Sequence, residues 1–394
     1  MNILVVTQYY YPEPFRINEI CEEFVKRGHS VTVLTGRPNY PDGEIYDGYS
    51  NIFQEEHKGV VILRCKNRPR KKGSLNLLLN YISFWIKASM YIRKLSKDFD
   101  MVYSYQLSPI SSSSPACWYA KKYHKPYFLY CLDIWPESIK ESFSSKSPIY
   151  KCISWISKKI YSSADTIGVT SPSFIYYLSD LIQRPQERFA YIPQHARDIL
   201  CKSDSIVHER LNILFTGNIG ASQNLDVLVD AISHIKDEHG FKVTIVGSGS
   251  DLERLQEKVQ QLGITELITF TGRQPKEKMA DYYEDADICF LSLRDEGAVS
   301  WTIPGKLQEY MSAGKTILAA INGDARFVIE DAQCGVCVNY DDSVGLSKVI
   351  LDFVKNKKRL LSFGHNSRAY YLKHFTLAKH VDALEKIFGS TVSL

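Results

Sequence analysis

The stretch SWTIPGKLQEYMSAGK, from Ser300 to Lys315, guides the interpretation of the whole chain. It predicts a loop that runs into a short helix, because Pro304 suits a first helical position and Gly314 suits the position just past a helix end. A helix N-terminus carries unpaired N–H donors and a positive dipole end, so it attracts phosphate.

The residues at the start of this expected helix suit the diphosphate and ribose of a nucleotide. Gly305 allows a ligand to approach the backbone closely, and Lys306 adds a positive charge. Glu309, about one turn further along, is the right type of residue to accept two ribose hydroxyls. Thr302 and Pro304 belong to the same predicted donor-binding segment. A surface helix with ordinary capping fits these residues about equally well.

Length and composition favour a two-domain globular protein. The chain has 394 residues, of which 44% are hydrophobic and 23% are charged. Its start, Met1–Val6, lacks a basic segment and a long apolar run, so it predicts a first β-strand rather than a signal peptide. Nine scattered cysteines favour a reducing, cytoplasmic compartment.

The net charge of +4 is unevenly divided. Residues 1–195 carry 25 Lys and Arg against 17 Asp and Glu, whereas the remainder carries 23 against 27. A basic half indicates binding to nucleic acid or to an anionic membrane surface.

Short β-branched and aromatic runs alternate with helical patterns along the chain. The clearest helical pattern is Glu13–Arg27, which Gly28 ends. Such alternation implies a parallel sheet covered on both faces. The strands expected in the first half are Ile3–Val6, Ser30–Thr35, Val60–Arg64, Met101–Tyr105, Pro126–Cys131 and Thr166–Val169.

A polar segment without apolar periodicity, residues 196–210, predicts a linker, and the alternation restarts after it. We therefore expect an α/β protein with two tandem Rossmann-like, doubly wound domains, 1–195 and 196–394, whose last helices cross back to the first domain. Ligands of such sheets bind at the carboxyl ends of the strands, so two facing sheets would place the site in the cleft between them. The later strands are expected at Ile213–Thr216, Lys242–Val246, Leu267–Thr271, Ile288–Ser292, Thr316–Ala320 and Gly335–Val338.

Two glycine turns follow strands in the second half. Gly217 and Asn218 follow the first of these strands, and Gly247 follows the second. A turn of this kind before a helix can cradle a phosphate. Arg273 and Gln274 follow the third strand, where they would contact the nucleotide base.

Loops at the carboxyl ends of the first two strands predict an acceptor-binding side in the first domain. The first loop is rich in Tyr and Pro, and the second is rich in turn formers. The polar residues at the start of the following helix suit a sugar or phosphate as well as they suit plain capping. The candidate acceptor-binding residues are Tyr10, Pro12, Arg16, Asn18, Asn39 and Tyr40.

Asp133 ends a further strand, next to Trp and shortly before Pro. At that place its carboxylate can polarise an acceptor hydroxyl or hold a sugar hydroxyl, although a lone Asp can equally cap the next helix. The Asp-x-Asp pairs at residues 98–100 and 285–287 stand before strands, so we interpret them as turns. No cluster with metal-ligand spacing appears, and no metal is expected.

A basic cluster, Lys66–Lys72, precedes the apolar segment Leu75–Ile86. A basic cluster next to an apolar segment is typical of a helix that lies on an anionic membrane. The apolar segment itself is too interrupted to span a bilayer. The alternative is a fully buried crossover helix preceded by a solvated loop. Nucleic-acid binding is disfavoured because no recognised binding module accompanies the charge.

Over nearly its whole length the chain resembles the family 4, retaining glycosyltransferases of the GT-B fold, most closely the bacterial surface-polysaccharide transferases that move N-acetyl-L-fucosamine. The segments that carry the resemblance are Gln8–Asn18, Arg27–Val31, Pro38–Pro41, Asp133–Pro136, Gly217–Gly220 and Pro304–Met311.

The resemblance implies roles for individual residues. Glu309 resembles the second glutamate of the family's E-x7-E motif, which holds the ribose, and Trp301 stands where the first would be. Asn218 and Gln223 occupy the region where the family usually has a pair of basic residues, Arg and Lys. Lys306 is therefore left as the cation for the diphosphate, and Asp133 completes the implied catalytic set.

The resemblance also implies a reaction. The donor would be UDP-N-acetyl-L-fucosamine, and the acceptor an N-acetylhexosamine on polyprenyl diphosphate, in O-antigen or capsule synthesis. No cofactor, metal or nucleic acid is implied, and the enzyme would be cytoplasmic and peripheral to the inner membrane. The alternatives are a UDP-N-acetylglucosamine 2-epimerase-like enzyme and a non-catalytic binding partner for lipid-linked sugars in an assembly complex.

Overall fold

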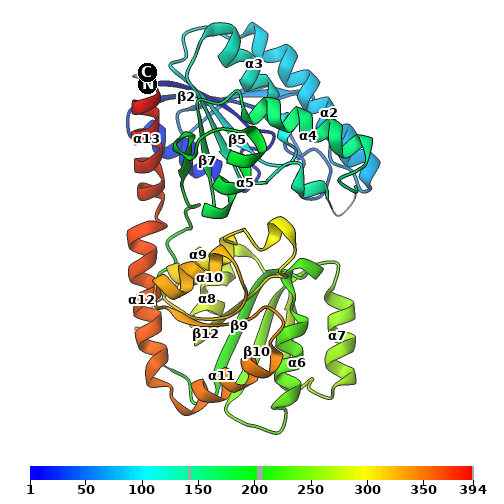
Figure 1. Ribbon diagram of the computed structural model, residues 1–394, viewed down its shortest axis with the longest axis vertical. Coiled ribbons are helices and arrows are strands. Elements are labelled where there is room, and N and C mark those ends of the chain that lie inside the picture. The colour runs from blue at the N-terminus through cyan, green and yellow to red at the C-terminus, as the bar shows by residue number, and fades with distance from the viewer. Residues whose placement is uncertain (141–142, 202–206, 393–394) are drawn as a thin grey trace. The chain divides into compact units, whose positions relative to one another are not determined.

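The computed structural model describes residues 1–140, 143–201 and 207–392, and the chain divides into two compact units (Figure 1). Unit 1 comprises Met1–Pro193 together with the chain from Leu377 onward, and unit 2 comprises Gln194–Thr376. The middle of the expected linker, residues 202–206, lies outside the described residues.

Unit 1 is organised around a sheet with the strand order β3-β4-β2-β1-β5-β6-β7-β8. All six strands expected from the sequence are present, and all neighbours pair in parallel except β3 with β4. The strands are β1 (Asn2–Val6), β2 (Ser30–Gly36), β3 (Gln54–His57), β4 (Val60–Cys65), β5 (Met101–Gln106), β6 (Tyr127–Cys131), β7 (Thr166–Val169) and β8 (Phe189–Tyr191).

The helices of unit 1 follow the alternation with the strands. They are α1 (Ile17–Lys26), α2 (Ser74–Tyr91), α3 (Ser114–Tyr123), α4 (Pro148–Tyr161), α5 (Pro172–Ile182) and α13 (Leu377–Val392). The helix expected from Glu13 begins only at Ile17, because the Glu13 carboxylate accepts backbone N–H groups from loops. The edge strand β3 was not expected, since its sequence QEEH has no apolar alternation.

Unit 2 has a parallel sheet with the order β11-β10-β9-β12-β13-β14. The order in which strands are added to the sheet reverses between β9 and β12, which is where doubly wound sheets bind ligands. The strands are β9 (Leu211–Asn218), β10 (Phe241–Ser248), β11 (Ile268–Gly272), β12 (Ile288–Ser292), β13 (Thr316–Ala320) and β14 (Gly335–Val338). The helices are α6 (Asp226–His234), α7 (Leu252–Gln261), α8 (Met279–Glu284), α9 (Gly305–Ser312), α10 (Asp324–Asp331), α11 (Ser343–Lys355) and α12 (Lys358–His374).

The core of unit 2 lies on both faces of this sheet. Ile213 and Phe215 of β9 belong to one buried apolar cluster, whereas Leu214 between them belongs to another. Successive side chains of a strand point to opposite faces, so both faces are covered, as the continuous apolar runs of the sequence predict.

The last helix, α13, packs on the first domain and completes its core. Phe388 is fully buried, and its ring centroid lies 5.4 Å from that of Phe128 and 5.7 Å from those of Phe24 and Tyr103. At the surface of the same contact, Glu385 accepts a hydrogen bond from Arg27 at 2.8 Å. Unit 1 is therefore built from both ends of the chain.

We expect Phe388→Ala to lower the free energy of unfolding of unit 1 by about 3–5 kcal/mol, because it empties a fully buried aromatic site. Urea denaturation followed by fluorescence measures the change. Ser390→Ala, at an exposed position of the same helix, is the matched control and should leave stability unchanged. A loss below about 1 kcal/mol for Phe388→Ala would show that α13 contributes little to the core.

Candidate functional site

Two glycines meet at the carboxyl edge of the sheet of unit 2. Gly217, at the end of β9, pairs in register with Gly247 of β10, and both have positive φ, +122° and +153°. A Cβ atom on Gly247 would lie 1.8 Å from the carbonyl oxygen of Gly217. Only glycine fits at Gly247, so the backbone of this edge is bare of side chains, as a phosphate cradle requires.

Lys306, on the first turn of α9, reaches this glycine edge. Its Cδ lies 3.2 Å from the place a Cβ of Gly217 would occupy, and its ammonium lies 4.1 Å from the ring centroid of Phe215. The ammonium also donates a hydrogen bond to the side-chain oxygen of Gln223. Pro304 stands at the N-cap rather than at the first helical position, because the helix begins at Gly305.

Burial lowers the pKa of Lys306 to about 7, although the nearby carboxylate of Glu309 acts in the opposite direction. A lysine in this state is only partly charged at neutral pH, because its surroundings compensate the ammonium poorly. An incoming anion would supply that compensation. The site is therefore electrostatically suited to a group with the charge of a phosphate.

Glu309 is linked to β9 through Tyr283, and a second tyrosine, Tyr310, is hydrogen-bonded to the same residue of β9. Its Oε2 accepts a hydrogen bond from the hydroxyl of Tyr283 at 3.4 Å, and that hydroxyl lies 3.2 Å from the Thr216 hydroxyl. The hydroxyl of Tyr310 accepts the backbone N–H of Thr216 at 3.0 Å. Neither tyrosine was predicted from the sequence, because aromatic residues within helices usually indicate only core packing.

The other predicted donor-binding residues also lie on unit 2, but they differ in exposure and in hydrogen bonding. Asn218 and Arg273 are exposed, the latter beyond the edge strand β11. The amide of Gln274 donates to the carbonyl of Thr271 at 2.8 Å, and the hydroxyl of Thr302 donates to a carbonyl in its own loop. The hydroxyl of Thr302 is thus already hydrogen-bonded within its own loop, whereas the exposed side chains of Asn218 and Arg273 can reach a ligand.

In unit 1, a residue that the site prediction missed, Glu13, joins the two predicted acceptor loops. Its Oε1 accepts the backbone N–H groups of Asn39 and Tyr40 at 2.8 and 2.7 Å, and its Oε2 accepts the N–H of Tyr10 at 3.3 Å. The only sequence signal was an acidic residue between two prolines, Pro12 and Pro14, in a loop.

Two predicted acceptor-binding side chains are used for structure instead. The ring of Tyr10 is buried in the core of unit 1, so only its backbone is part of the loop surface. Asn39 is also buried, and its side-chain oxygen accepts the backbone N–H of Arg70 at 2.7 Å. The local pattern of a polar, aromatic loop did not reveal which side chains turn inward.

The other acceptor candidates are partly exposed. Pro12, Arg16 and the ring of Tyr40 belong to this group. Asn18 donates a hydrogen bond from its amide nitrogen to the carbonyl of Glu13 at 2.8 Å, which fixes the loop to the start of α1.

Asp133 follows β6 and belongs to a relay of side chains. Its Oδ2 accepts a hydrogen bond from the hydroxyl of Ser108 at 2.8 Å, and the Ser108 oxygen accepts the indole N–H of Trp135 at 3.1 Å. Ser108 follows β5, which lies next to β1, and the order in which strands are added to the sheet reverses between these two strands. Asp133 is thus oriented at the ligand edge and does not cap the next short helix.

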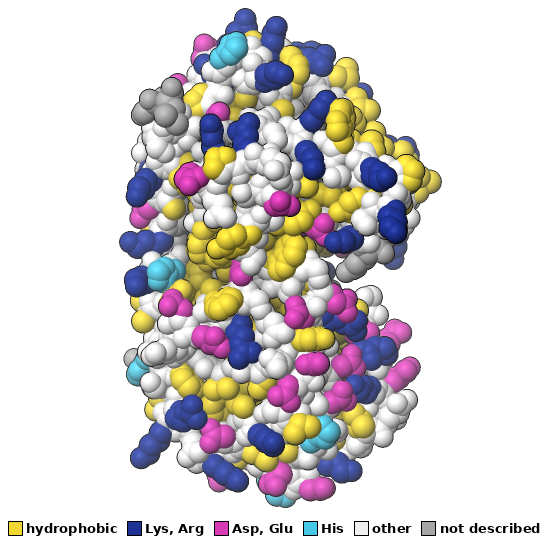
Figure 2. All heavy atoms as spheres, viewed as in Figure 1, with side chains coloured by type: hydrophobic (Ala, Val, Ile, Leu, Met, Phe, Trp, Pro, Cys, Tyr) yellow, Lys and Arg dark blue, Asp and Glu magenta, His cyan; other side chains and the backbone are white. Residues whose placement is uncertain are grey.

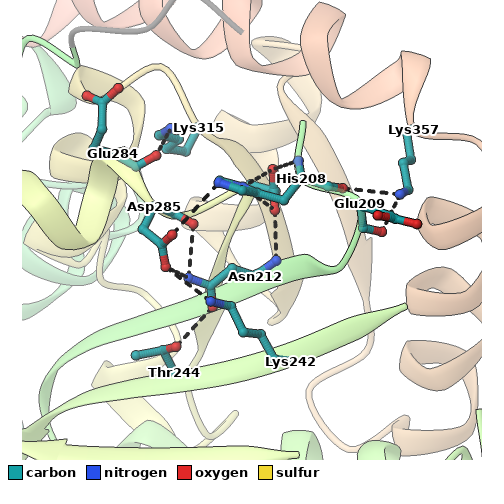
Figure 3. A network of polar contacts seen from close by, with 10 residues as sticks. His208, Glu209, Asn212, Lys242, Thr244, Glu284, Asp285, Lys315 and Lys357 are labelled. Carbon is teal, nitrogen blue, oxygen red and sulfur yellow. Dashed lines mark hydrogen bonds and ion pairs between the residues drawn. The ribbon is translucent and has the colours of Figure 1, made fainter. Parts of the chain in front are cut away.

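The carboxylates of the second Asp-x-Asp pair make hydrogen bonds and ion pairs at the amino ends of the strands, away from the glycine edge (Figure 3). Asp285 accepts a hydrogen bond from the amide of Asn212 and pairs with Lys242, and Asp287 accepts the backbone N–H of Asn212 at 2.7 Å. These residues lie where β9 and β12 begin, so the interpretation as a turn is confirmed. Among the described residues, no group of three or more His, Cys, Asp or Glu side chains is placed to hold a metal.

Two protein-family descriptions match this chain. "Glycosyl transferase 4-like domain" matches residues 15–195, and "Glycosyl transferases group 1" matches residues 210–356. The two matches fall on unit 1 and unit 2 respectively and together span most of the chain.

Individual proteins agree with these matches. WcaI of Escherichia coli (strain K12), named provisionally as a colanic acid biosynthesis glycosyl transferase, is 24% identical over 80% of this chain and 82% of its own length. Sucrose-phosphate synthase from Thermosynechococcus elongatus superposes with a TM-score of 0.78 at 16% identity, over 100% of this chain and 99% of that one. Anabaena HepE, solved with UDP and glucose, has a TM-score of 0.72 at 15% identity, over 99% and 100% of the two chains. The chain is therefore a glycosyltransferase with the GT-B fold, and its two units match the glycosyl transferase 4-like and group 1 descriptions in that order.

Proposed function

We propose that this glycosyltransferase moves N-acetyl-L-fucosamine from its UDP donor to an N-acetylhexosamine on polyprenyl diphosphate, in O-antigen or capsule synthesis. The family resemblance of the sequence supports this donor. The name of WcaI supports surface-polysaccharide synthesis, and the UDP in HepE supports a uridine nucleotide.

The observation that carries the proposal is the position of Lys306. Its partly desolvated ammonium lies against the bare glycine edge at Gly217, at the start of a helix, and Glu309 lies one turn further along. A diphosphate on this edge would meet an ammonium and backbone N–H donors, and a ribose hydroxyl would meet a carboxylate. These are the groups that bind a sugar nucleotide.

The same residues suggest how the chain would assist transfer. Charge builds up on the departing diphosphate as the sugar–oxygen bond breaks, and Lys306 with the N-terminus of α9 would stabilise that charge. The diphosphate would accept the acceptor's proton, so retention would require neither a metal nor a cofactor. Asp133, held by Ser108, would orient a hydroxyl of the acceptor or the donor.

The acceptor side of the proposal rests on a basic cavity in unit 1. The cavity holds about 700 Å³ and combines three adjacent cations with two carboxylates, which suits an anionic headgroup next to sugar hydroxyls. It is lined by Pro41, Asp42, Glu44, Arg70, Lys71, Lys72, Gly73, Ser74 and Leu77.

The membrane side of the proposal rests on α2, which follows this cavity. The alternative of a fully buried helix is wrong, because Leu75 is 67% exposed and Met90 is 55% exposed, whereas Phe84 on the other face is buried. The exposed apolar side chains of α2 lie along one face and are Leu75, Leu78, Ile82, Trp85, Ile86 and Met90.

The charge around α2 complements an anionic lipid surface. Residues 66–97 contain nine Lys and Arg and no Asp or Glu. Figure 2 shows hydrophobic side chains and Lys or Arg side chains intermixed over the part of unit 1 where Figure 1 draws α2. Such a surface binds in the plane of a membrane. None of the helices in the described part of the chain is long and apolar enough to cross one.

The test of the function is turnover with a panel of UDP- and GDP-sugars and a synthetic polyprenyl-diphosphate N-acetylhexosamine. We expect a lipid-linked disaccharide from UDP-N-acetyl-L-fucosamine, and a loss of about 100-fold in kcat for Lys306→Ala, because the charge of the leaving group is no longer stabilised. Mass spectrometry and NMR of the anomeric proton identify the product and its configuration.

The control for this substitution is Lys315→Ala, which removes a lysine just beyond the other end of α9 and should retain activity. Equal losses in both variants, or full activity of Lys306→Ala, would remove Lys306 from the mechanism. Epimerised sugar from UDP-N-acetylglucosamine alone would indicate an epimerase, and no turnover with any donor would indicate a binding partner.

The lowered pKa of Lys306, about 7, predicts that nucleotide binding takes up protons. Above this pH the free side chain is mostly neutral and must be charged again when the diphosphate arrives, so affinity falls as pH rises. We expect UDP affinity to fall by roughly tenfold between pH 6.5 and 8.5, beyond any change in Lys306→Gln. Calorimetry in buffers of different ionisation enthalpy measures the proton uptake, and equal pH profiles for the two proteins would contradict it.

We expect the face of α2 to bind vesicles that contain anionic lipids, with binding that weakens as salt is added. Trp85→Glu places a charge among apolar side chains that would enter the headgroup region and should reduce sedimentation with the vesicles several-fold. Phe327→Glu, at a 70% exposed apolar position of unit 2, makes the same kind of change elsewhere and should have no effect. Similar reductions in both variants would argue against α2 as the binding face.

A further inference from the structure

Glu13 is a buried carboxylate that holds two loops together by their backbones. Its side chain is 1% exposed, yet it lies between the loop after β1, residues 7–16, and the loop after β2, residues 37–43. Three backbone N–H groups, from Tyr10, Asn39 and Tyr40, donate to its two oxygens.

The loops that Glu13 joins form an aromatic platform beside the basic cavity. The ring of Phe15 lies 5.3 Å from that of Tyr9 and 5.2 Å from that of Tyr40, measured between centroids. The guanidinium of Arg70, which lines the cavity, lies 5.5 Å from the Tyr40 ring. A shift of the second loop would therefore move both the platform and one wall of the cavity.

The charges around Glu13 come from several elements. Arg64 of β4 is the cation that favours the ionised form, and it is itself hydrogen-bonded to the carbonyl of Tyr11 and paired with Glu55. Tyr9 adjoins Glu13 from its own loop, and Arg70 acts on Tyr9 from the start of the cavity. Burial, the three backbone N–H groups and Arg64 are the main influences on the pKa of Glu13.

We propose that Glu13 is a positioning residue, which keeps the two loops in register and thereby sets the enzyme's affinity for its acceptor but not for its donor. The inference rests on the proposed function insofar as unit 1 binds the acceptor. It concerns unit 1 alone, whereas the predicted donor-binding residues all belong to unit 2.

Ionisation of Glu13 controls how many of the three bonds can form. A carboxylate accepts at both oxygens, whereas a carboxylic acid carries a proton on one of them and must release a donor there. Burial raises the pKa of Glu13 to about 7, although the three N–H groups and Arg64 oppose the change. The loops are therefore fully joined above this pH and loosen as pH falls through it, the opposite direction to the effect expected for the Lys306 site.

Glu13→Gln isolates this role. The glutamine has nearly the same shape, but its NH₂ group would face an N–H donor, so one bond is replaced by a repulsion. We expect an increase of about tenfold in KM for the acceptor, the usual loss when a hydrogen bond to a charged group is removed, with KM for the donor unchanged. In the wild type, acceptor KM should rise as pH is lowered from 8 to 6, and in Glu13→Gln it should stay constant.

The matched control is Glu56→Gln, which makes the same change in charge at an exposed position of β3 in unit 1. It should leave both KM values and their pH dependence as in the wild type. A wild-type acceptor KM that is constant between pH 6 and 8, or a donor KM that changes as much as the acceptor KM, would overturn the proposal.

A second measurement does not need the acceptor. Hydrogen–deuterium exchange at the amides of Asn39 and Tyr40, corrected for intrinsic rates, should be slow at pH 8 and faster by about tenfold in Glu13→Gln or in the wild type at pH 6. Equal protection in the wild type and the variant would refute the role of Glu13 even if the variant stays folded and active. Absence of transfer by the wild type would instead refute the proposed function and leave the exchange result as the test of Glu13.

Discussion

The candidate site in unit 2 depends on one buried ammonium group, that of Lys306, whose positive charge the surrounding protein compensates poorly. Lys306 is held against Phe215 and Gln223, neither of which carries a charge, so the protein gives it little to replace its hydration. At Gly217 and Gly247 the adjoining edge of the sheet presents backbone to the lysine, not side chains. An anion bound at this edge would stabilise the charged form of the lysine.

In unit 1 a buried carboxylate, Glu13, holds two loops in place. These loops at the ligand edge carry aromatic rings and prolines and would not be held by a sheet or a helix. The Glu13 carboxylate supplies the missing order by accepting N–H groups of both loops. Unit 2 thus carries a lysine, Lys306, whose charge the protein compensates poorly. Unit 1 carries a carboxylate, Glu13, whose three N–H donors come from the protein itself.

The parts of the fold that could be predicted from the sequence are those marked by a short continuous pattern, such as an apolar run. The strands Ile288–Ser292 and Thr316–Ala320 begin and end where their apolar runs do. The start of α1 and the inward turn of Tyr10 were not predictable, because both depend on contacts between segments far apart in the chain. In the site, Lys306 and Glu309 could be found from one continuous motif, whereas Glu13, Ser108 and Tyr283 act through partners 25 or more residues away.

The closure of unit 1 by α13 bears on how the protein is made. The ring of Phe388 fills a space among side chains of β5, β6 and α1, and these elements leave the ribosome more than 200 residues earlier. A nascent first domain must therefore wait with an open apolar seam while the whole of unit 2 is synthesised, which makes it a natural client for chaperones during translation. Because the closing segment emerges only after unit 2, a chain that stops before Leu377 would have an intact second domain and an unsealed first one.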